Sequence, residues 1–271
     1  MSLDLPQRVQ QRLKGARDFA HTTGMFTSDL SVNEYLLVRK AGFEPVGLCA
    51  GTSVYHVGIQ YGDWSTNQEL WVLSAAMYKA RDLAMSRLRA DAAAMNADGI
   101  VGVRLEIRRV EFEERLLEFV ALGTAIVHRD AHPGFRAHDD GPFTSNLSGQ
   151  DFWTLLHAGY RPLQLVMGSC VYHVAHRGAL AAIGTMGQNV ELHKVSSALY
   201  GAREIAVERM RKEAAAAQAG GVVGVDIHEG SHGWQTHVIE FFAIGTAVLP
   251  LAEEIAPDKI PDPIMVLSIN D

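Results

Sequence analysis

The sequence contains one strand-like segment twice, and this repetition constrains the fold more than any other feature. GTSVYHV at 51–57 returns as GSCVYHV at 168–174, 117 residues later. FTSDLS at 26–31 returns as FTSNLS at 143–148 with the same spacing. Two matches at one fixed spacing indicate an internal repeat of domain size.

The spacing between matching segments changes once along the chain. GIVGV at 99–103 returns as GVVGV at 221–225, and EFVALGTAIV at 118–127 returns as EFFAIGTAVL at 240–249, both 122 residues later. The second copy has therefore gained five residues, and the gain lies after its VYHV phrase. A tandem duplication with one loop insertion accounts for the whole pattern.

The repeat divides the chain into five parts. We predict an N-terminal helical segment (1–25), a first domain (26–129), a linker (130–142), a second domain (143–250) and an extended C-terminal tail (251–271). The join between the copies is polar and contains Pro and Gly, which is typical of a linker.

Composition excludes several classes of protein. The net charge is −7 and no run is rich in Lys or Arg, so the electrostatic footprint of a nucleic-acid-binding protein is missing. No stretch approaches the roughly 18 apolar residues of a membrane span. The two cysteines, Cys49 and Cys170, form no CxxC pair and predict no disulfide framework. The N-terminus lacks an apolar signal region, so we expect a cytoplasmic protein.

Each copy predicts the same α+β unit. A short helix at 30–41 ends at Gly42, and a strand containing VYHV follows. A long helix at about 72–96 has a narrow, Ala-rich apolar stripe, so another element is expected to pack closely against it. The VGV and GTA segments then pair as antiparallel strands, joined in the second copy by a tight turn at 230–233. The expected fold class is α+β, with helices over a mostly antiparallel sheet.

The order of these segments resembles a known family. ARDLAMSRL…GIVGV…GTAIV and AREIAVERM…GVVGV…GTAVL are similar to the YbjQ-like family of heavy-metal-binding domains, over roughly 44–128 and 161–249. The resemblance implies a small α+β domain that assembles into a pentameric ring, so a homo-oligomer of five chains is expected. Ten domains would then form either one ring or two stacked rings.

The repeated histidines, His56 and His173, are the first candidate site. Strand alternation places His56 on the face of Val54, and it separates His173 from Cys170. In a ring, several copies of each histidine would gather, where imidazoles bind a metal or sense pH. The alternative is that each histidine bonds a neighbouring backbone group and fixes the strand.

The second candidate site is a cluster in the second copy: Asp226, His228, His232 and His237. Asp226 and His228 share a strand face, and a hairpin would bring the other two near. Three nitrogen or oxygen ligands suit Zn²⁺ or Ni²⁺, so the possible cofactor is a divalent transition metal. Solvent-facing histidines with no metal are the alternative.

A helix arginine and a strand glutamate also recur, as Arg81 and Arg203 and as Glu118 and Glu240. We predict an arginine–carboxylate pair between helix and sheet or between subunits. If it is buried, it fixes register more than it adds stability.

The tail supplies the candidate for partner binding. After a proline-rich stretch, an apolar run could add a strand to a sheet edge, either within the assembly or on a protein partner. Its residues are Ile264, Met265, Val266, Leu267 and Ile269. The sequence therefore favours a non-enzymatic, ring-forming protein that binds a ligand or metal or serves as a scaffold. The alternative is a metal-dependent enzyme that uses the Asp226 cluster.

Overall fold

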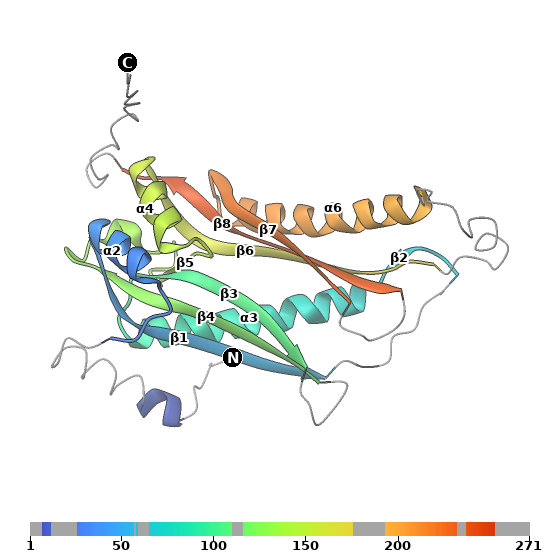
Figure 1. Cartoon of the computed structure of the whole chain (residues 1–271), viewed down its shortest axis with the longest axis horizontal. Coiled ribbons are helices and arrows are strands. Elements are labelled where there is room, and N and C mark those ends of the chain that lie inside the picture. Colours follow the sequence, from blue (N-terminus) through green and yellow to red (C-terminus); the bar gives the residue numbers. More distant parts are fainter. Residues whose placement is uncertain are drawn as a thin grey trace, which may run out of the picture.

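The structure is a computed structural model that describes residues 7–11, 26–56, 58, 65–109, 116–175, 193–231 and 237–252. Its fold class is α+β, as the sequence predicted (Figure 1). The first repeat contains α2 (Val32–Lys40), β1 (Phe43–His56), β2 (Gln68–Glu69), α3 (Trp71–Ala94), β3 (Gly99–Arg109) and β4 (Leu116–His128). The second repeat contains β5 (Phe143–Thr144), α4 (Gly149–His157), β6 (Tyr160–His173), α6 (His193–Ala216), β7 (Gly221–Gly230) and β8 (Val238–Pro250).

Each repeat forms most of one sheet and contributes one short strand to the sheet of the other repeat. Sheet A has the strand order β1-β4-β3-β5, and sheet B has the order β2-β6-β8-β7. Thus β5 of the second repeat extends sheet A, and β2 of the first repeat extends sheet B. Among the described strands the pairing is antiparallel except for β3 with β5. Neither exchange was predicted from the sequence.

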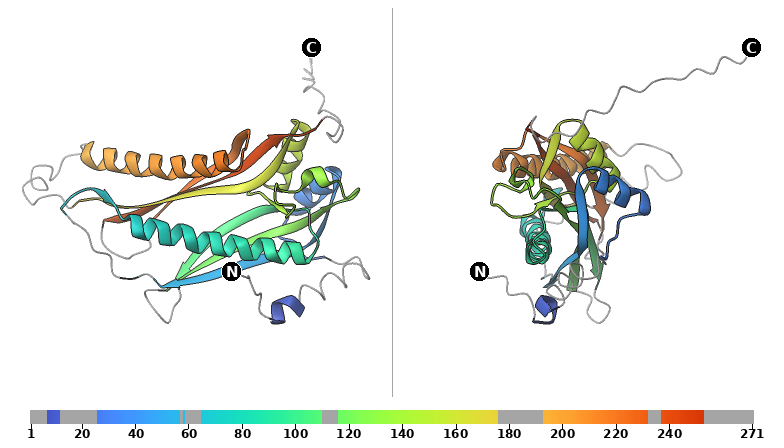
Figure 2. Two further views of the ribbon diagram at one scale, coloured as in Figure 1. Left: turned by 180° about the vertical axis from the view of Figure 1, so that it is seen from behind. Right: turned by 90° about the vertical axis from the view of Figure 1, so that its left-hand side faces the viewer.

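The long helix α3 lies between the two sheets. It packs on β1 and β4 of its own repeat and also contacts β6 of the other. α6 covers the opposite face of sheet B, so sheet B carries a helix on both faces (Figure 2). One hydrophobic cluster, which joins Met77 and Leu88 of α3 to Met167 and Phe242 of sheet B, forms the main core.

Two glycines allow the long helices to approach their sheets. A Cβ atom at Gly51 would clash with the carbonyl oxygen of Ala84 on α3. In the second repeat, a Cβ atom at Gly168 would clash with the carbonyl oxygen of Ala206 on α6. The Ala-rich stripe had predicted this close packing, and the contact is repeated in both copies.

The short helix α2 begins with a capping box. The Ser31 hydroxyl accepts a hydrogen bond from the backbone N–H of Glu34, and the Glu34 carboxylate accepts one from the backbone N–H of Ser31. The helix ends one residue before Ala41, and Gly42 follows with a φ of +89°, which favours glycine. The sequence expectation of a helix ended by Gly42 is confirmed.

The join between the repeats is packed against the core. A 3-10 helix, η1 (Pro133–Phe135), is capped by the ring of His132, and the Phe135 side chain is buried. At the N-terminus, residues 7–11 are helical and Val9 packs on the core. Among the described helices, none is long and apolar enough to cross a membrane. The tail residues 264–269 and residues 232 and 233 of the turn predicted at 230–233 lie outside the described residues.

Candidate functional site

A buried ion pair joins the two repeats. Arg81 of α3 donates hydrogen bonds to both carboxylate oxygens of Glu240 on β8, with N···O distances of 2.6 and 3.0 Å. Both side chains are almost completely buried, at 3% and 2% exposed. The Ser169 hydroxyl donates a third hydrogen bond to Glu240 over 2.6 Å. Such a pair fixes the docking of α3 on sheet B, because removing one partner leaves a buried charge uncompensated.

Aromatic packing completes this ion-pair site. The Arg81 guanidinium lies over the ring of Phe242, 3.8 Å from its centroid, and 5.6 Å from the ring of Phe119. The flat cation is therefore held between side chains of both sheets. The sequence had predicted an arginine–carboxylate pair of these residue types, but not that it crosses from one repeat to the other.

Two further polar contacts connect the same surfaces. The Tyr78 hydroxyl of α3 bonds to the carboxylate of Glu213 on α6, which also accepts from the backbone N–H of Met167 over 2.9 Å. Burial raises the pKa of Glu213 above its ordinary value. Arg209 donates to both carboxylate oxygens of Glu69, with N···O distances of 2.5 and 3.0 Å. Glu69, just before α3, and Tyr78, on α3, thus bind side chains of α6.

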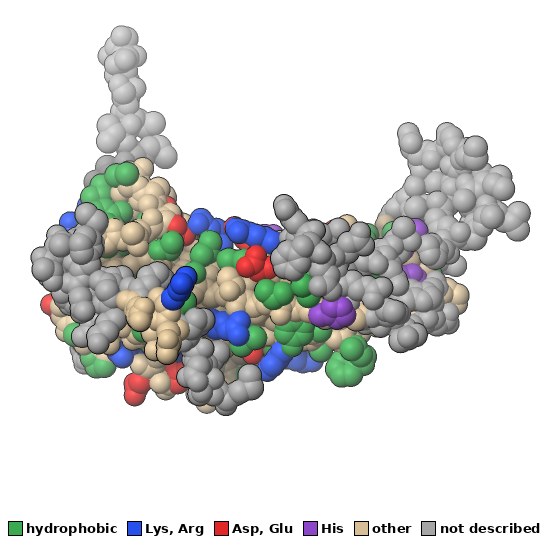
Figure 3. All heavy atoms as spheres, turned by 90° about the horizontal axis from the view of Figure 1, so that it is seen from below, with side chains coloured by type: hydrophobic (Ala, Val, Ile, Leu, Met, Phe, Trp, Pro, Cys, Tyr) green, Lys and Arg blue, Asp and Glu red, His purple; other side chains and the backbone are tan. Residues whose placement is uncertain are grey.

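The matching surfaces on the other side of the molecule are open. Val171 on β6 is fully buried beneath α3, whereas its counterpart on β1, Val54, is 56% exposed. On the helices, Tyr78 is half-buried, whereas its counterpart Tyr200 is 65% exposed. Figure 3, seen from below, shows hydrophobic and basic side chains intermingled on the side of the molecule where β1 lies. The chain therefore presents an exposed face of sheet A, at β1, and an exposed face of α6. The corresponding faces of sheet B and α3 cover each other.

Arg203 and Glu118 correspond to the buried pair, and each lies beside a different charged residue of its own repeat. Arg203 reaches Glu229 over 3.8 Å and remains 38% exposed. Glu118 on β4 is half-buried and lies opposite Arg108 of β3 in the sheet. Each residue of this second pair lies on one of the two open surfaces.

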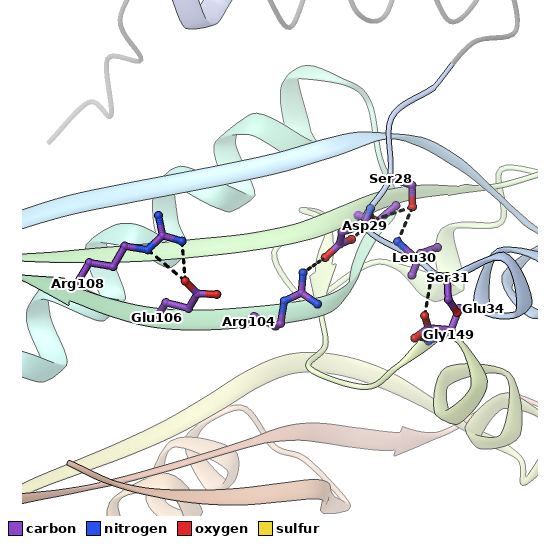
Figure 4. A network of polar contacts seen from close by, with 10 residues as sticks. Ser28, Asp29, Leu30, Ser31, Glu34, Arg104, Glu106, Arg108 and Gly149 are labelled. Atoms are coloured by element: carbon purple, nitrogen blue, oxygen red, sulfur yellow. Dashed lines mark hydrogen bonds and ion pairs between the residues drawn. The ribbon is translucent and has the colours of Figure 1, made fainter.

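A polar network holds the segment that precedes α2 against sheet A (Figure 4). The hydroxyls of Ser28 and Thr124 are 3.1 Å apart, and Arg104 of β3 forms an ion pair with Asp29 at 2.8 Å. Glu34 also accepts a hydrogen bond from the backbone N–H of Gly149, at the start of α4. The start of the first repeat is thus fixed to both its own sheet and the second repeat.

The repeated histidines have different surroundings. His173 is buried, and its Nδ1 lies 3.2 Å from the backbone oxygen of Thr66, which is the structural role considered as the alternative. His56 is exposed on sheet A. Its neighbours Ser53 and Val54 are buried and exposed in turn, so the predicted alternation of faces is confirmed.

The structure brings together only part of the Asp226 cluster. The Oδ2 atom of Asp226 lies 3.3 Å from the Nε2 atom of His228, and both side chains are exposed. His237 directly precedes β8 and has a φ of +71°. His232 lies outside the described residues. No group of three or more potential metal ligands occurs among the residues that the structure describes. The four-residue metal site therefore stays a prediction.

The cysteines are buried in the sheets. Cys170 packs beneath α6, and burial raises the pKa of its thiol to about 12. A thiol with that pKa is protonated at neutral pH, which does not favour a role as a nucleophile.

Comparison with known proteins identifies the family. The model of the YbjQ family, described as "Putative heavy-metal-binding", matches residues 68–129 and 160–250. The chain belongs to the YbjQ family. The two matched regions, one in each repeat, show the tandem duplication of the YbjQ-like domain.

Two relatives accompany the family match. An encapsulin nanocompartment protein of Mycobacterium tuberculosis is 45% identical over 229 residues, covering 84% of this chain and 87% of the relative. A UPF0145 protein of Natronomonas pharaonis is 46% identical over 61 residues, covering 22% of this chain and 57% of the relative. The first alignment is long enough to include most of both YbjQ-like repeats.

Proposed function

We propose that this YbjQ-family protein is a non-enzymatic scaffold that assembles from copies of itself into a closed ring. The observation that carries the proposal is the unequal burial of matching residues, such as Val171 and Val54. Matching surfaces cover each other between the repeats of one chain, and their counterparts at the two ends are open. Contacts of this head-to-tail kind either close into rings or grow into filaments.

The same geometry limits the number of domains in a ring. When the contact between repeats is continued by the contact between chains, a ring contains an even number of domains. A single ring of five domains is therefore incompatible with two-domain chains that use this contact. Five chains would form one ring of ten domains, and five remains the stoichiometry that we propose from the family resemblance.

The relative's name indicates the setting in which such a scaffold acts. The protein 45% identical to this chain is named an encapsulin nanocompartment protein. We propose that the present chain likewise takes part in a protein compartment in the cytoplasm. The apolar tail, 264–269, is the segment proposed to bind the protein partner or to dock within the assembly.

The mass of the particle tests the proposal. Native mass spectrometry and light scattering of untagged protein should give five times the chain mass of 29.6 kDa, with the same mass after chelator treatment. A single-chain mass at all concentrations up to about 100 µM would contradict self-assembly. Removing residues 261–271 should leave the ring mass unchanged and abolish capture of the compartment partner.

No described feature favours the enzymatic alternative over the scaffold. A metal-dependent enzyme would use the Asp226 cluster, in which the described residues contribute one exposed Asp–His pair. If the protein bound stoichiometric metal and had a catalytic activity, and if His228→Ala removed both, the result would support the enzymatic alternative.

A further inference from the structure

An open groove separates α6 from β7 in the second repeat. It has a volume of about 430 Å³ and is lined by small and apolar residues together with Arg211. The lining includes Val207, Met210, Ala214, Gly221, Val222 and Val225. Val225 is 47% exposed, whereas the matching residue of the first repeat, Val103, is buried.

In the first repeat, the start of the second repeat covers the edge of the strand that matches β7. Phe143 and Thr144 form β5, which pairs in parallel with Gly99 and Ile100 of β3. The Phe143 ring lies so close to Gly99 that a Cβ atom there would clash with it. The contact is therefore a strand addition with an aromatic side chain seated on a glycine.

Backbone hydrogen bonds continue this contact beyond β5. Ser145 donates its N–H to the oxygen of Ile100, and Val103 donates to the oxygen of Ser145, both over 2.9 Å. Gly102 donates to the oxygen of Leu147 over the same distance. Gly102 has a φ of +65° and its counterpart Gly224 has a φ of +58°, so both strands offer this N–H from the same unusual backbone conformation.

The first repeat carries its own version of the inserted segment. FTSDL at 26–30 matches FTSNL at 143–147. The Phe26 ring stacks on Tyr35 at 5.1 Å, as the Phe143 ring stacks on Phe152 at 5.8 Å. Phe143 and Thr144 are buried, whereas Phe26 is half-buried and Thr27 is exposed.

The segment at 26–30 already has the conformation of its counterpart. The backbone N–H of Asp29 donates to the Thr124 hydroxyl over 3.2 Å. The backbone N–H of Asn146 donates to the Thr246 hydroxyl over 3.1 Å. A segment that is ordered before binding loses little conformational entropy when it binds, which favours the contact.

We propose that residues 26–30 of a second copy of this chain bind along the edge of β7, beside the groove between α6 and β7. They add to β7 as a parallel strand, and Phe26 of that copy rests on Gly221 as Phe143 rests on Gly99. This inference rests on the proposed self-assembly and names the segment that makes it. The same docking places Arg203 of one chain beside Glu118 of the next, in the arrangement of Arg81 and Glu240.

An exposed aromatic residue supports this occupant. Phe43 is buried among Phe143 and Phe152, with ring centroids 6.4 and 5.2 Å away. Its counterpart Tyr160 is 43% exposed at the corresponding end of sheet B. Docking of the second copy brings Phe26 and Tyr35 to Tyr160 and covers it.

Gly221→Ala tests the proposed contact between Gly221 and Phe26 of the second copy. In the described chain, a Cβ atom at Gly221 meets only Val248, at 3.8 Å, so we expect the fold and its unfolding midpoint to be unchanged. In the assembly it would strike the incoming ring, so the concentration at which half of the particles dissociate should rise about tenfold or more. The matched control is Gly220→Ala, because its Cβ atom meets atoms at 3.5 and 3.6 Å that belong to its own repeat. Assembly of Gly221→Ala at the wild-type concentration would overturn the proposal.

Cross-linking with cysteines tests the strand pairing. Thr27→Cys and Val222→Cys introduce thiols at the positions that match the paired residues Thr144 and Ile100. Oxidation of the double variant should give a ladder of covalently linked chains on a non-reducing gel, and each single variant should give none. A wild-type mass that shows an oligomer, without a ladder from the double variant, would overturn the segment assignment and leave self-assembly standing. A wild-type chain that is monomeric would instead remove the proposed function itself.

Discussion

The two ends of this chain carry matching surfaces in opposite states. Around α3 and β3, the second repeat covers the helix, adds β5 to the edge of β3 and pairs the arginine. Around α6 and β7, the same kinds of residue are exposed, and a groove remains. The difference arises from position in the chain and not from residue type, because Arg, Tyr, Val and Gly recur at the matching sites. The contact between the repeats of one chain is therefore the contact that we propose for the open end.

The ion pairs give the largest expected contrast. Glu240→Ala should lower the free energy of unfolding by about 3–5 kcal/mol, because it leaves Arg81 buried without its counter-charge. Glu118→Ala should cost the dissociated chain about 1 kcal/mol or less, because its carboxylate is only half-buried. Urea unfolding at a concentration where the chain is monomeric measures both values. Equal losses of stability would show that Glu118 and Glu240 do not differ in burial as described.

The two repeated histidines should differ in the same direction, but by a smaller free energy. His173→Ala removes the contact with the oxygen of Thr66 inside the chain, so we expect a loss of about 1–3 kcal/mol. His56→Ala should change the stability of the dissociated chain by about 0.5 kcal/mol or less, because His56 is exposed. Thermal unfolding of both variants tests this, and a larger loss for His56 than for His173 would contradict it.

The pH dependence of stability tests the Glu213 contact. Burial raises the pKa of this carboxyl in the folded protein, so the folded state holds the proton more tightly than the unfolded state. The stabilising contribution is therefore complete below the ordinary pKa of 4.5 and is lost as the pH rises through the folded value. Glu213→Gln should flatten the unfolding free energy over that pH range. An unchanged pH profile would show that Glu213 does not titrate in this way.

His228→Ala has the smallest expected effect on the fold. The Asp226–His228 pair is exposed, so stability should change by about 0.5 kcal/mol or less and the particle mass should be unchanged. Elemental analysis of the wild type and the variant, after exposure to Zn²⁺, provides the second readout. One zinc ion per chain that disappears in the variant would support the predicted metal site.

The repeated pattern predicted the elements well, because helix and strand periodicities are local properties of the sequence. The helix expected at about 72–96 is Trp71–Ala94, and the antiparallel pairing of the VGV and GTA strands is confirmed. The register of the first strand of each repeat shifts just after Pro45 and Pro162, because proline has no N–H to donate to the ladder.

The contacts between the repeats were less predictable. Arg81 and Glu240 were identified as members of a pair, but they lie 159 residues apart in different copies, and sequence spacing does not reveal which copy supplies each partner. β2 and β5 have two residues each, too few to produce a strand pattern. Only the docking of the two halves shows that these short segments belong to the neighbouring sheets.

In the proposed assembly, the first repeat of the next copy covers the open end of the second repeat. An exchange of charges between Arg203 and Glu118 tests this contact. Light scattering should show that Arg203→Glu and Glu118→Arg each dissociate the particle, and that the double variant regains the wild-type mass, because the restored pair joins two chains. Arg203→Glu that retains the wild-type mass at all concentrations would contradict the claim.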